Sequence, residues 1–194
     1  MIYTKEKLKE IFDIAHVEFK IQQKEGEFLP VMEMLNEAKA KNIVEIGSYD
    51  GGTSYCLAHF TDRLISIDIA SARFDTERIN KITNYNFIHC NSQTEECDKQ
   101  LKLLLKDEQV DVLFIDGDHT YEGIKDDFFI YEKYVKSGGL ILFHDIVNSE
   151  MHLRLGCTVW KFWEEAKKNY QKGGFFSEII TTTEWGGIGV IKKY

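Results

Sequence analysis

The sequence has little proline and fewer basic than acidic residues, and each shortage excludes a class of protein. Its 194 residues include one proline, and 24 Lys and Arg stand against 32 Asp and Glu, a formal net charge of −8. A single proline excludes collagen-like and proline-rich linker chains. The acidic balance argues against nucleic acid or an anionic membrane as the main partner, because clustered basic faces bind phosphate groups.

Long apolar runs and paired cysteines are lacking as well. No charge-free run approaches the ~20 residues of a membrane span, and the first ten residues are too charged for a secretory signal. The four cysteines (Cys56, Cys90, Cys97 and Cys157) form no CxxC pair. We therefore expect reduced thiols in a cytoplasmic protein. With 43% hydrophobic residues, the composition predicts one globular domain over residues 1–194.

The first 41 residues show helical periodicity. Apolar residues recur at helical spacing over residues 5–19, after Thr4 as a plausible N-cap. A second helix is expected to begin at Pro30, since proline is tolerated in a first helical turn. These N-terminal helices precede a core that we place at residues 42–194.

In that core, short apolar runs alternate with helix-length segments. The runs predict strands at 42–47, 64–68, 86–90, 110–116 and 139–144, and the segments between them predict helices at 51–60, 72–81, 94–107 and 121–136. This alternation predicts an α/β fold: a Rossmann-like parallel sheet with helices on both faces. A helix at 157–169 and strands at 177–183 and 188–192 would add a C-terminal antiparallel β-hairpin.

The first strand runs into a glycine-rich loop, VEIGSYDGGTS at residues 44–54. Glycines let a ligand approach the backbone closely. The spacing G-x-x-x-G-G differs from the dinucleotide fingerprint G-x-G-x-x-G. Glu45, expected to point toward the ligand pocket, favours a cationic cofactor such as S-adenosylmethionine over a pyrophosphate. The alternative is a plain strand-to-helix turn that binds nothing.

Asp68 ends the second strand, 21 residues after Gly47. An acid at the carboxyl edge of an adjacent strand can bind both ribose hydroxyls of a nucleotide-like cofactor. The alternative is a capping role for the helix predicted at 72–81.

Acids and histidines gather where the fourth and fifth strands end. Asp116, Asp118 and His119 follow one strand, and His144 and Asp145 follow the other. Neighbouring parallel strands would bring these groups to one edge of the sheet. Several acids repel one another unless a cation joins them, so a divalent ion such as Mg²⁺ is expected.

These motifs together resemble a known family. The glycine loop, Asp68, FIDGDHTYE at 114–122 and SGGLILFHD at 137–145 look like class I S-adenosylmethionine-dependent methyltransferases of the methyltransferase-24 type. That group is similar to macrolide and sugar O-methyltransferases and, more distantly, to catechol and caffeoyl-CoA O-methyltransferases. The resemblance covers residues 42–192. It implies the seven-stranded methyltransferase fold and methyl transfer to a hydroxyl of a small molecule.

The resemblance also implies roles for individual residues. The cofactor-binding set is Glu45, Gly47, Ser48, Gly51, Thr53, Ser54, Asp68, Asn91, Ser92 and Asp116. The metal set is Asp116, His144 and Asp145, in which His144 departs from the acid of the family and would favour Mn²⁺, Fe²⁺ or Zn²⁺. Two alternatives stay open: Asp116 as a helix cap, and Ser92 or Thr94 as a cap of the next helix.

His119 occupies the position where catechol-type enzymes carry a catalytic lysine. A histidine is well matched to removing a hydroxyl proton near pH 7. The expected mechanism is an in-line displacement: a metal bound at Asp116 lowers the pKa of the acceptor hydroxyl, His119 takes the proton, and the oxygen attacks the sulfonium methyl.

The acceptor carries no signature of its own. Its pocket is expected from residues 1–30 and 146–160, with one ring of Trp160, Phe162 or Trp163 as a lining candidate and the others in the core. Related enzymes often dimerise, which makes the N-terminal helices candidate homodimer contacts. Competing functions are an NAD-dependent oxidoreductase, a metal-dependent hydrolase and a non-catalytic cofactor-binding protein. The remaining histidines (His16, His59, His89 and His152) are interpreted as structural.

Overall fold

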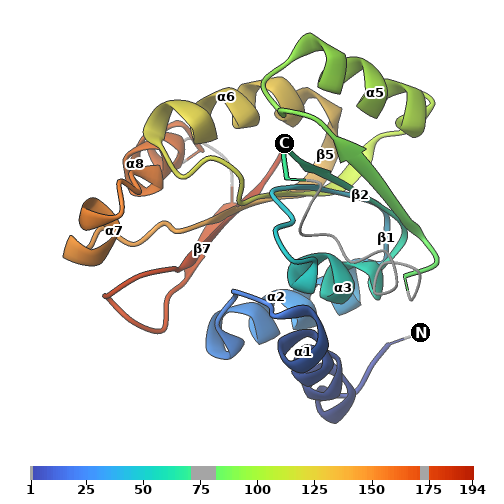
Figure 1. The fold of residues 1–194 in the computed structure, drawn as a ribbon, viewed down its shortest axis with the longest axis horizontal. Helices are drawn as coiled ribbons and strands as arrows, with labels where there is room; N and C mark the ends of the chain where they lie inside the picture. The colour runs from blue at the N-terminus through green and yellow to red at the C-terminus, as the bar shows by residue number, and fades with distance from the viewer. Residues whose placement is uncertain (1, 71–81, 171–174) are drawn as a thin grey trace.

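One mixed sheet organises the computed structural model, which describes residues 2–70, 82–170 and 175–194 (Figure 1). In this part of the chain seven strands lie in the order β3-β2-β1-β4-β5-β7-β6. Their bounds are β1 Ala40–Ile46, β2 Thr61–Asp68, β3 Tyr85–His89, β4 Val110–Ile115, β5 Val135–His144, β6 Phe175–Ile179 and β7 Ile188–Lys192. The first five are parallel and β7 is antiparallel to both β5 and β6. The predicted Rossmann-like sheet and C-terminal hairpin are confirmed.

Helices cover both faces of this sheet (Figure 1). The bounds are α1 Lys5–Phe19, α2 Glu25–Ala38, α3 Gly52–Ala58, α5 Glu95–Leu105, α6 Tyr121–Tyr131, α7 Glu150–Arg154 and α8 Val159–Tyr170, with a 3₁₀ turn at Glu132–Tyr134. The helix predicted at 72–81 lies outside the described residues. None of the helices in the described ranges is both long enough and apolar enough to cross a bilayer.

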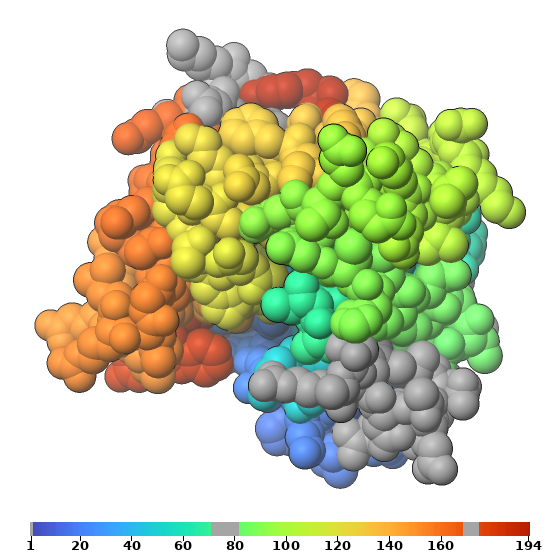
Figure 2. Space-filling model, turned by 45° about the horizontal axis from the view of Figure 1, so that its top comes forward, coloured from blue at the N-terminus to red at the C-terminus, as the bar shows by residue number. Residues whose placement is uncertain are grey.

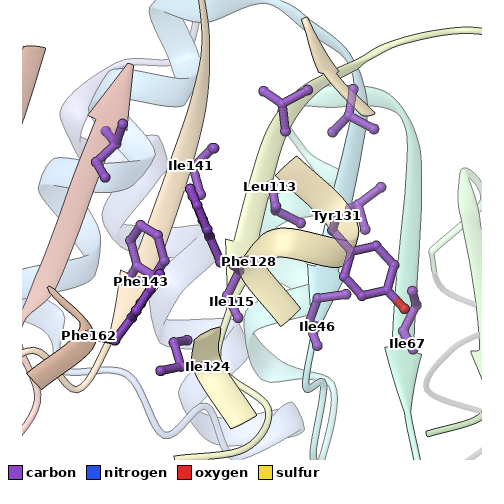
Figure 3. Packing of buried hydrophobic residues seen from close by; sticks show 14 of the residues in the cluster. Ile46, Ile67, Leu113, Ile115, Ile124, Phe128, Tyr131, Ile141, Phe143 and Phe162 are labelled. Carbon is purple, nitrogen blue, oxygen red and sulfur yellow. The ribbon is translucent and has the colours of Figure 1, made fainter. Parts of the chain in front are cut away.

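Strand side chains alternate between two apolar cores. Ile46, Leu113 and Ile115 point toward α6 (Figure 3) and belong to a core that continues under α5 and α8. Ile43 and Phe114, offset by an odd number of residues from these, join the core under α1, α2 and α3. This alternation is the period of two that extended backbone imposes. Figure 2 shows α5 (green) and α6 (yellow) from outside, covering the first core.

The N-terminal helices match the sequence in one case and differ in the other. Helix α1 starts after Thr4, whose hydroxyl accepts from the Lys7 amide, as predicted. Helix α2 begins at Glu25 and holds Pro30 inside it, so the predicted start at Pro30 is wrong. We attribute the earlier start of α2 to a tertiary contact in its first turn. There the fully buried Glu27 carboxylate accepts from the Thr181 and Gly187 amides.

That contact also explains the boundary of β6. The strand predicted at 177–183 is found at Phe175–Ile179. Both the amide and the hydroxyl of Thr181 donate to Glu27, which draws residue 181 away from pairing with β7. The short helix α7 was not predicted, because its five residues are too few to show a helical period.

Candidate active site

A cavity of about 830 Å³ opens at the carboxyl ends of the parallel strands. Strands β1 and β4 pair directly, whereas the chain leaves β1 to form β2 on its other side, so the strand order reverses at this point. Ligands of open α/β sheets bind at such a switch point. The wall combines the loops after β1 to β5 with residues 20–23 and with Met151, His152, Leu155, Cys157 and Trp185.

The glycine loop after β1 forms one side of the cavity. Gly47 has φ +85°, and a Cβ atom there would lie 2.1 Å from the carbonyl oxygen of Asp116. Only glycine permits this approach between the ends of β1 and β4. Gly51, with φ +84°, precedes α3 as its N-cap residue. Ser48 and Thr53 line the cavity, while Gly51 shapes the turn without lining it.

Asp68 fastens the loop to the end of β2. Its Oδ2 atom accepts from the amides of Ser48 at 2.8 Å and Tyr49 at 2.9 Å, and its Oδ1 atom accepts from the Ala70 amide at 2.7 Å. The carboxylate is half-buried and lines the cavity. Asp68 therefore fixes the geometry of the loop, and its Oδ1 atom, with one amide partner, keeps acceptor capacity toward the cavity.

Glu45 does not line the cavity in the described part of the chain, contrary to the prediction that it points into the ligand pocket. Glu45 lies two residues after Ile43 in β1, so both side chains point to the face of the sheet that α3 covers. There Ser54 and Ser66 donate to Glu45 Oε2. Burial raises the pKa of Glu45 to about 8. Ser54 is likewise committed to this buried contact and does not line the cavity either.

Asn91 and Ser92 line the cavity beyond β3. The capping role open to Ser92 or Thr94 belongs to Thr94, whose hydroxyl accepts from the Cys97 amide at the start of α5. Ser92 instead donates to Asp127 on α6 at 2.7 Å. A second contact with α6 fixes the backbone of Ser92, because the Tyr131 hydroxyl donates to the Ser92 carbonyl at 2.6 Å.

The ends of β4 and β5 bring together the predicted acids and histidines. His144 Nδ1 lies 3.1 Å from Asp116 Oδ1 and 3.3 Å from Asp145 Oδ1. His119 spans the same two carboxylates, with Nε2 3.4 Å from Asp116 and Nδ1 3.3 Å from Asp145. Asp118 lines the same cavity but is not paired with these histidines: its carboxylate accepts from the Thr120 amide. Asp116 does not cap α6, since that role belongs to Thr120.

Asp145 adopts an unusual backbone conformation, with φ +63°. Such a conformation costs a non-glycine residue about 1–3 kcal/mol and persists where surrounding contacts impose it. The next two residues, Ile146 and Val147, donate their amides to the carbonyls of Gly187 and Gly186. The Gly186–Gly187 turn that leads into β7 thus fixes the backbone that follows Asp145.

Two side chains of this cluster were missed in the sequence. His152, predicted to be structural, is buried with Nε2 3.2 Å from Asp145 Oδ1 and Nδ1 2.6 Å from the Val147 carbonyl. Gln23 donates from Nε2 to Asp116 Oδ2 at 2.8 Å. Neither stands in a motif. Only the general expectation that residues 1–30 and 146–160 surround the pocket pointed to them. Phe162 and Trp163 are core residues and Trp160 does not line the cavity; among the described residues, Tyr49 and Trp185 contribute aromatic rings to its wall.

Charge pairing dominates the titration of the cluster. A hydrogen bond to Asp116 and the charges of both carboxylates raise the pKa of His119 to about 9. Burial opposes protonation of His144, but Asp116 and Asp145 hold its pKa well above the usual value. Burial favours the neutral form of Asp145, yet the hydrogen bond from His144 and the charges of His144 and His119 keep its pKa low. In this arrangement His119 is a cation at neutral pH and accepts no proton while it neutralises the acids.

The fold and the cavity define the class: a Rossmann-like protein with a glycine loop, an acid after β2 and an acidic β4–β5 edge, as in class I methyltransferases. The family model described as "Methyltransferase domain" matches residues 44–146, slightly more than half of the chain. The chain therefore belongs to this methyltransferase family, and the resemblance drawn from its motifs is confirmed.

Individual relatives agree with this assignment. A curated relative, "Uncharacterized protein R132" of Acanthamoeba polyphaga mimivirus, is 34% identical over 116 residues, 53% of this chain and 50% of that protein. The chain thus matches about half of the relative's length. Among solved structures, one titled a putative caffeoyl-CoA O-methyltransferase from Staphylococcus aureus has a TM-score of 0.68 at 20% identity, covering 98% of this chain and 92% of that one.

An O-methyltransferase from Bacillus cereus in complex with SAH is also similar. It has a TM-score of 0.62 at 18% identity, covering 100% of this chain and 93% of that one. Other similar structures bear the titles of an N-methyltransferase and an rRNA methylase. At these identities the likeness concerns the fold, and the acceptor is a separate question.

Proposed function

We propose that the protein transfers the methyl group of S-adenosylmethionine to a hydroxyl of a small molecule with the help of a divalent cation. One observation carries the proposal: the glycine loop with Asp68 and the acids Asp116 and Asp145 line a single cavity. A cationic methyl donor and a metal-bound acceptor both suit a pocket with acids on two sides. The net charge of −8 favours a small acceptor over nucleic acid.

The cofactor would lie across the ends of β1, β2 and β3. Gly47 and Ser48 provide close backbone contact, Asp68 offers acceptors to the ribose, and Asn91 with Ser92 lies where the adenine would reach. The sulfonium end would point toward Asp116, which places the transferable methyl beside the β4–β5 edge.

The donor set fits a divalent ion. One oxygen each of Asp116 and Asp145 and a ring nitrogen of His144 lie within 4.8 Å of one another. Two carboxylates and one imidazole suit Mn²⁺, Fe²⁺ or Mg²⁺. The site is closely supported, because Gln23 donates to Asp116 and His152 contacts Asp145. When bound, such an ion lowers the pKa of an acceptor hydroxyl.

The chain's own residues would then align and deprotonate the acceptor. Asp116 and Asp145 orient the hydroxyl, and His119 Nε2 receives its proton once the imidazole no longer neutralises these carboxylates. His119 is half-exposed, so the proton can pass on to solvent. Trp185, Met151 and Leu155 provide an apolar wall for the acceptor skeleton. Alignment of the oxygen with the methyl would supply most of the rate acceleration.

Calorimetry with S-adenosylmethionine and S-adenosylhomocysteine tests the cofactor part. We expect micromolar binding, and absence of binding to either at millimolar concentration would refute the proposal. Turnover with a panel of hydroxylated and amine acceptors, with and without a chelator, tests the rest. Asp145→Asn should lower turnover at least 100-fold, whereas Asp62→Asn, an exposed acid at the opposite end of β2, should leave it within twofold.

The N-methyltransferase among the similar structures makes amine acceptors the second candidate. Metal-independent turnover of an amine, with no turnover of any hydroxyl, would favour it.

A further inference from the structure

A second set of metal-ligating groups shares Asp145 with the first. A ring nitrogen of His119, a carboxylate oxygen of Asp145 and the sulfur of Cys157 lie within 4.8 Å of one another. Cys157 is buried, with 3% of its surface exposed, and lines the cavity. The two carboxylate oxygens of Asp145 face different partners: Oδ1 faces His144 and His152, and Oδ2 faces His119.

The backbone holds this second set in place. The Thr158 amide donates to the His119 carbonyl at 2.8 Å, and the Thr158 hydroxyl accepts from the Tyr121 amide at 2.7 Å. The Cys157 amide donates to the His152 carbonyl at 2.8 Å. The segment that carries Cys157 is thus tied both to the loop that carries His119 and to α7. A preformed arrangement of donors binds a cation without a large ordering cost.

The chemistry of the set differs from that of its neighbour. Sulfur, nitrogen and oxygen donors together suit Zn²⁺ or Co²⁺, whereas Mg²⁺ takes oxygen ligands almost alone. Three protein ligands leave a fourth tetrahedral position open to water. His119 is half-exposed, so an ion can reach the set from the cavity mouth.

We infer that His119, Asp145 and Cys157 form an inhibitory site for a thiophilic divalent cation such as Zn²⁺. On binding, the Cys157 thiol and the His119 imidazolium each release one proton to solvent. The metal then holds one ring nitrogen of His119 while the other keeps its hydrogen, so the imidazole has no lone pair left to receive the acceptor's proton. Asp145 is drawn away from the oxygen-rich set at the same time. The regulatory part of this inference rests on the proposed function, because it concerns the proposed base.

Cobalt provides a direct test, since thiolate coordination to Co²⁺ produces a charge-transfer band in the near ultraviolet. Titration of the full chain with Co²⁺ should produce that band at about one equivalent. Cys157→Ser should abolish it. Cys90→Ser, which alters another cysteine of the cavity wall, should retain it. A band that persists in Cys157→Ser, or that is absent from the wild-type protein, would overturn the site.

A competition experiment with a second variant separates loss of a ligand from misfolding of Cys157→Ser. Zn²⁺ affinity, measured against a chromophoric chelator, should fall at least 100-fold in His119→Ala as well as in Cys157→Ser. Equal affinity in wild type and His119→Ala would exclude the imidazole as a ligand and refute the set.

Turnover in excess Mg²⁺ tests regulation. One equivalent of Zn²⁺ should reduce the wild-type rate at least tenfold, and Cys157→Ser should need at least tenfold more Zn²⁺ for the same fractional loss. Equal sensitivity of the two proteins would overturn the inhibitory role. The metal-binding measurements use neither cofactor nor acceptor, so their failure is distinct from failure of the proposed methyl transfer.

Discussion

The two halves of the cavity are built differently. The half at the ends of β1, β2 and β3 is shaped by backbone: Gly47 makes a close approach to β4, and Asp68 accepts three amides. The half at the ends of β4 and β5 is a network of titratable side chains from three segments of the chain. The first half thus depends on local geometry, and the second on long-range packing and on charge.

The largest effect is expected from Gly47→Ala. The added methyl would lie 2.1 Å from the Asp116 carbonyl at φ +85°, so β1 and β4 must separate at the cavity floor. We expect a loss of about 3 kcal/mol or more in the free energy of unfolding and no measurable cofactor binding. Urea unfolding and calorimetry provide the measurements.

Gly156→Ala is the matched control. Gly156 has a similar φ of +77°, but a Cβ there meets nothing within 4 Å. This variant should lose only the roughly 1 kcal/mol that a left-handed conformation costs alanine. Equal losses at residues 47 and 156 would show that conformation, and not the close approach of β1 to β4, restricts residue 47.

Asp68→Asn should come next in size. The amide group keeps one acceptor oxygen but places a donor where the carboxylate meets either backbone amides or ribose. We expect the dissociation constant for S-adenosylhomocysteine to rise about 10–100-fold, which corresponds to roughly 1–3 kcal/mol. Asp62→Asn at the other end of β2 is the control. Unchanged affinity in Asp68→Asn would remove this acid from the cofactor site.

The charged half of the cavity, at the ends of β4 and β5, should make the free energy of unfolding depend on pH. The pKa of His119 is raised to about 9, so its stabilising contribution is complete below the unfolded value of about 6.5 and is lost as pH rises through 9. Wild type should therefore exceed His119→Gln in unfolding free energy at pH 6 and lose that excess by pH 9.5. Solvent screening of this half-exposed ring limits the change to about 1 kcal/mol.

Denaturant titrations across this pH range measure the difference, and the variant His16→Gln, at an exposed position of α1, is the control. A difference between wild type and His119→Gln that stays constant from pH 6 to 9.5 would contradict the charge pairing seen at His119.

The smallest effect is expected from Glu45→Gln. Its side chain lies behind the cavity wall, and a glutamine oxygen can still accept from Ser54 and Ser66. Cofactor affinity should stay within about threefold. Because burial raises the pKa of Glu45 from its usual value of 4.5 to about 8, the wild type loses stability relative to the variant as pH rises through that interval, and the variant should be the more stable protein at pH 8 and above.

Calorimetry and unfolding at pH 6 and pH 9 check both parts of this expectation. A loss of affinity as large as that of Asp68→Asn would return Glu45 to the cofactor-binding set in which the sequence placed it.

Sequence reasoning succeeded where a signal is local or follows from sheet topology. The change of period from helix to strand predicted the parallel order, and parallel strands bring their ends together, so Asp116 and Asp145 were expected to meet. Sequence reasoning failed for Glu45, because its side chain points to the face of the sheet that α3 covers and not out of the strand end toward the cavity. It also missed Gln23 and His152, which reach the cluster only through the packing of residues 20–23 and α7.

The buried carboxylate of Glu27 has a consequence for synthesis. Its partner Gly187 follows 160 residues later, so at roughly 5–20 residues per second the carboxylate of a nascent chain has only water and the nearby Lys24 as partners for about 10–30 s. The Trp185 wall forms only at the end of that interval. The cavity therefore reaches its complete form only after the C-terminal segment has been synthesised.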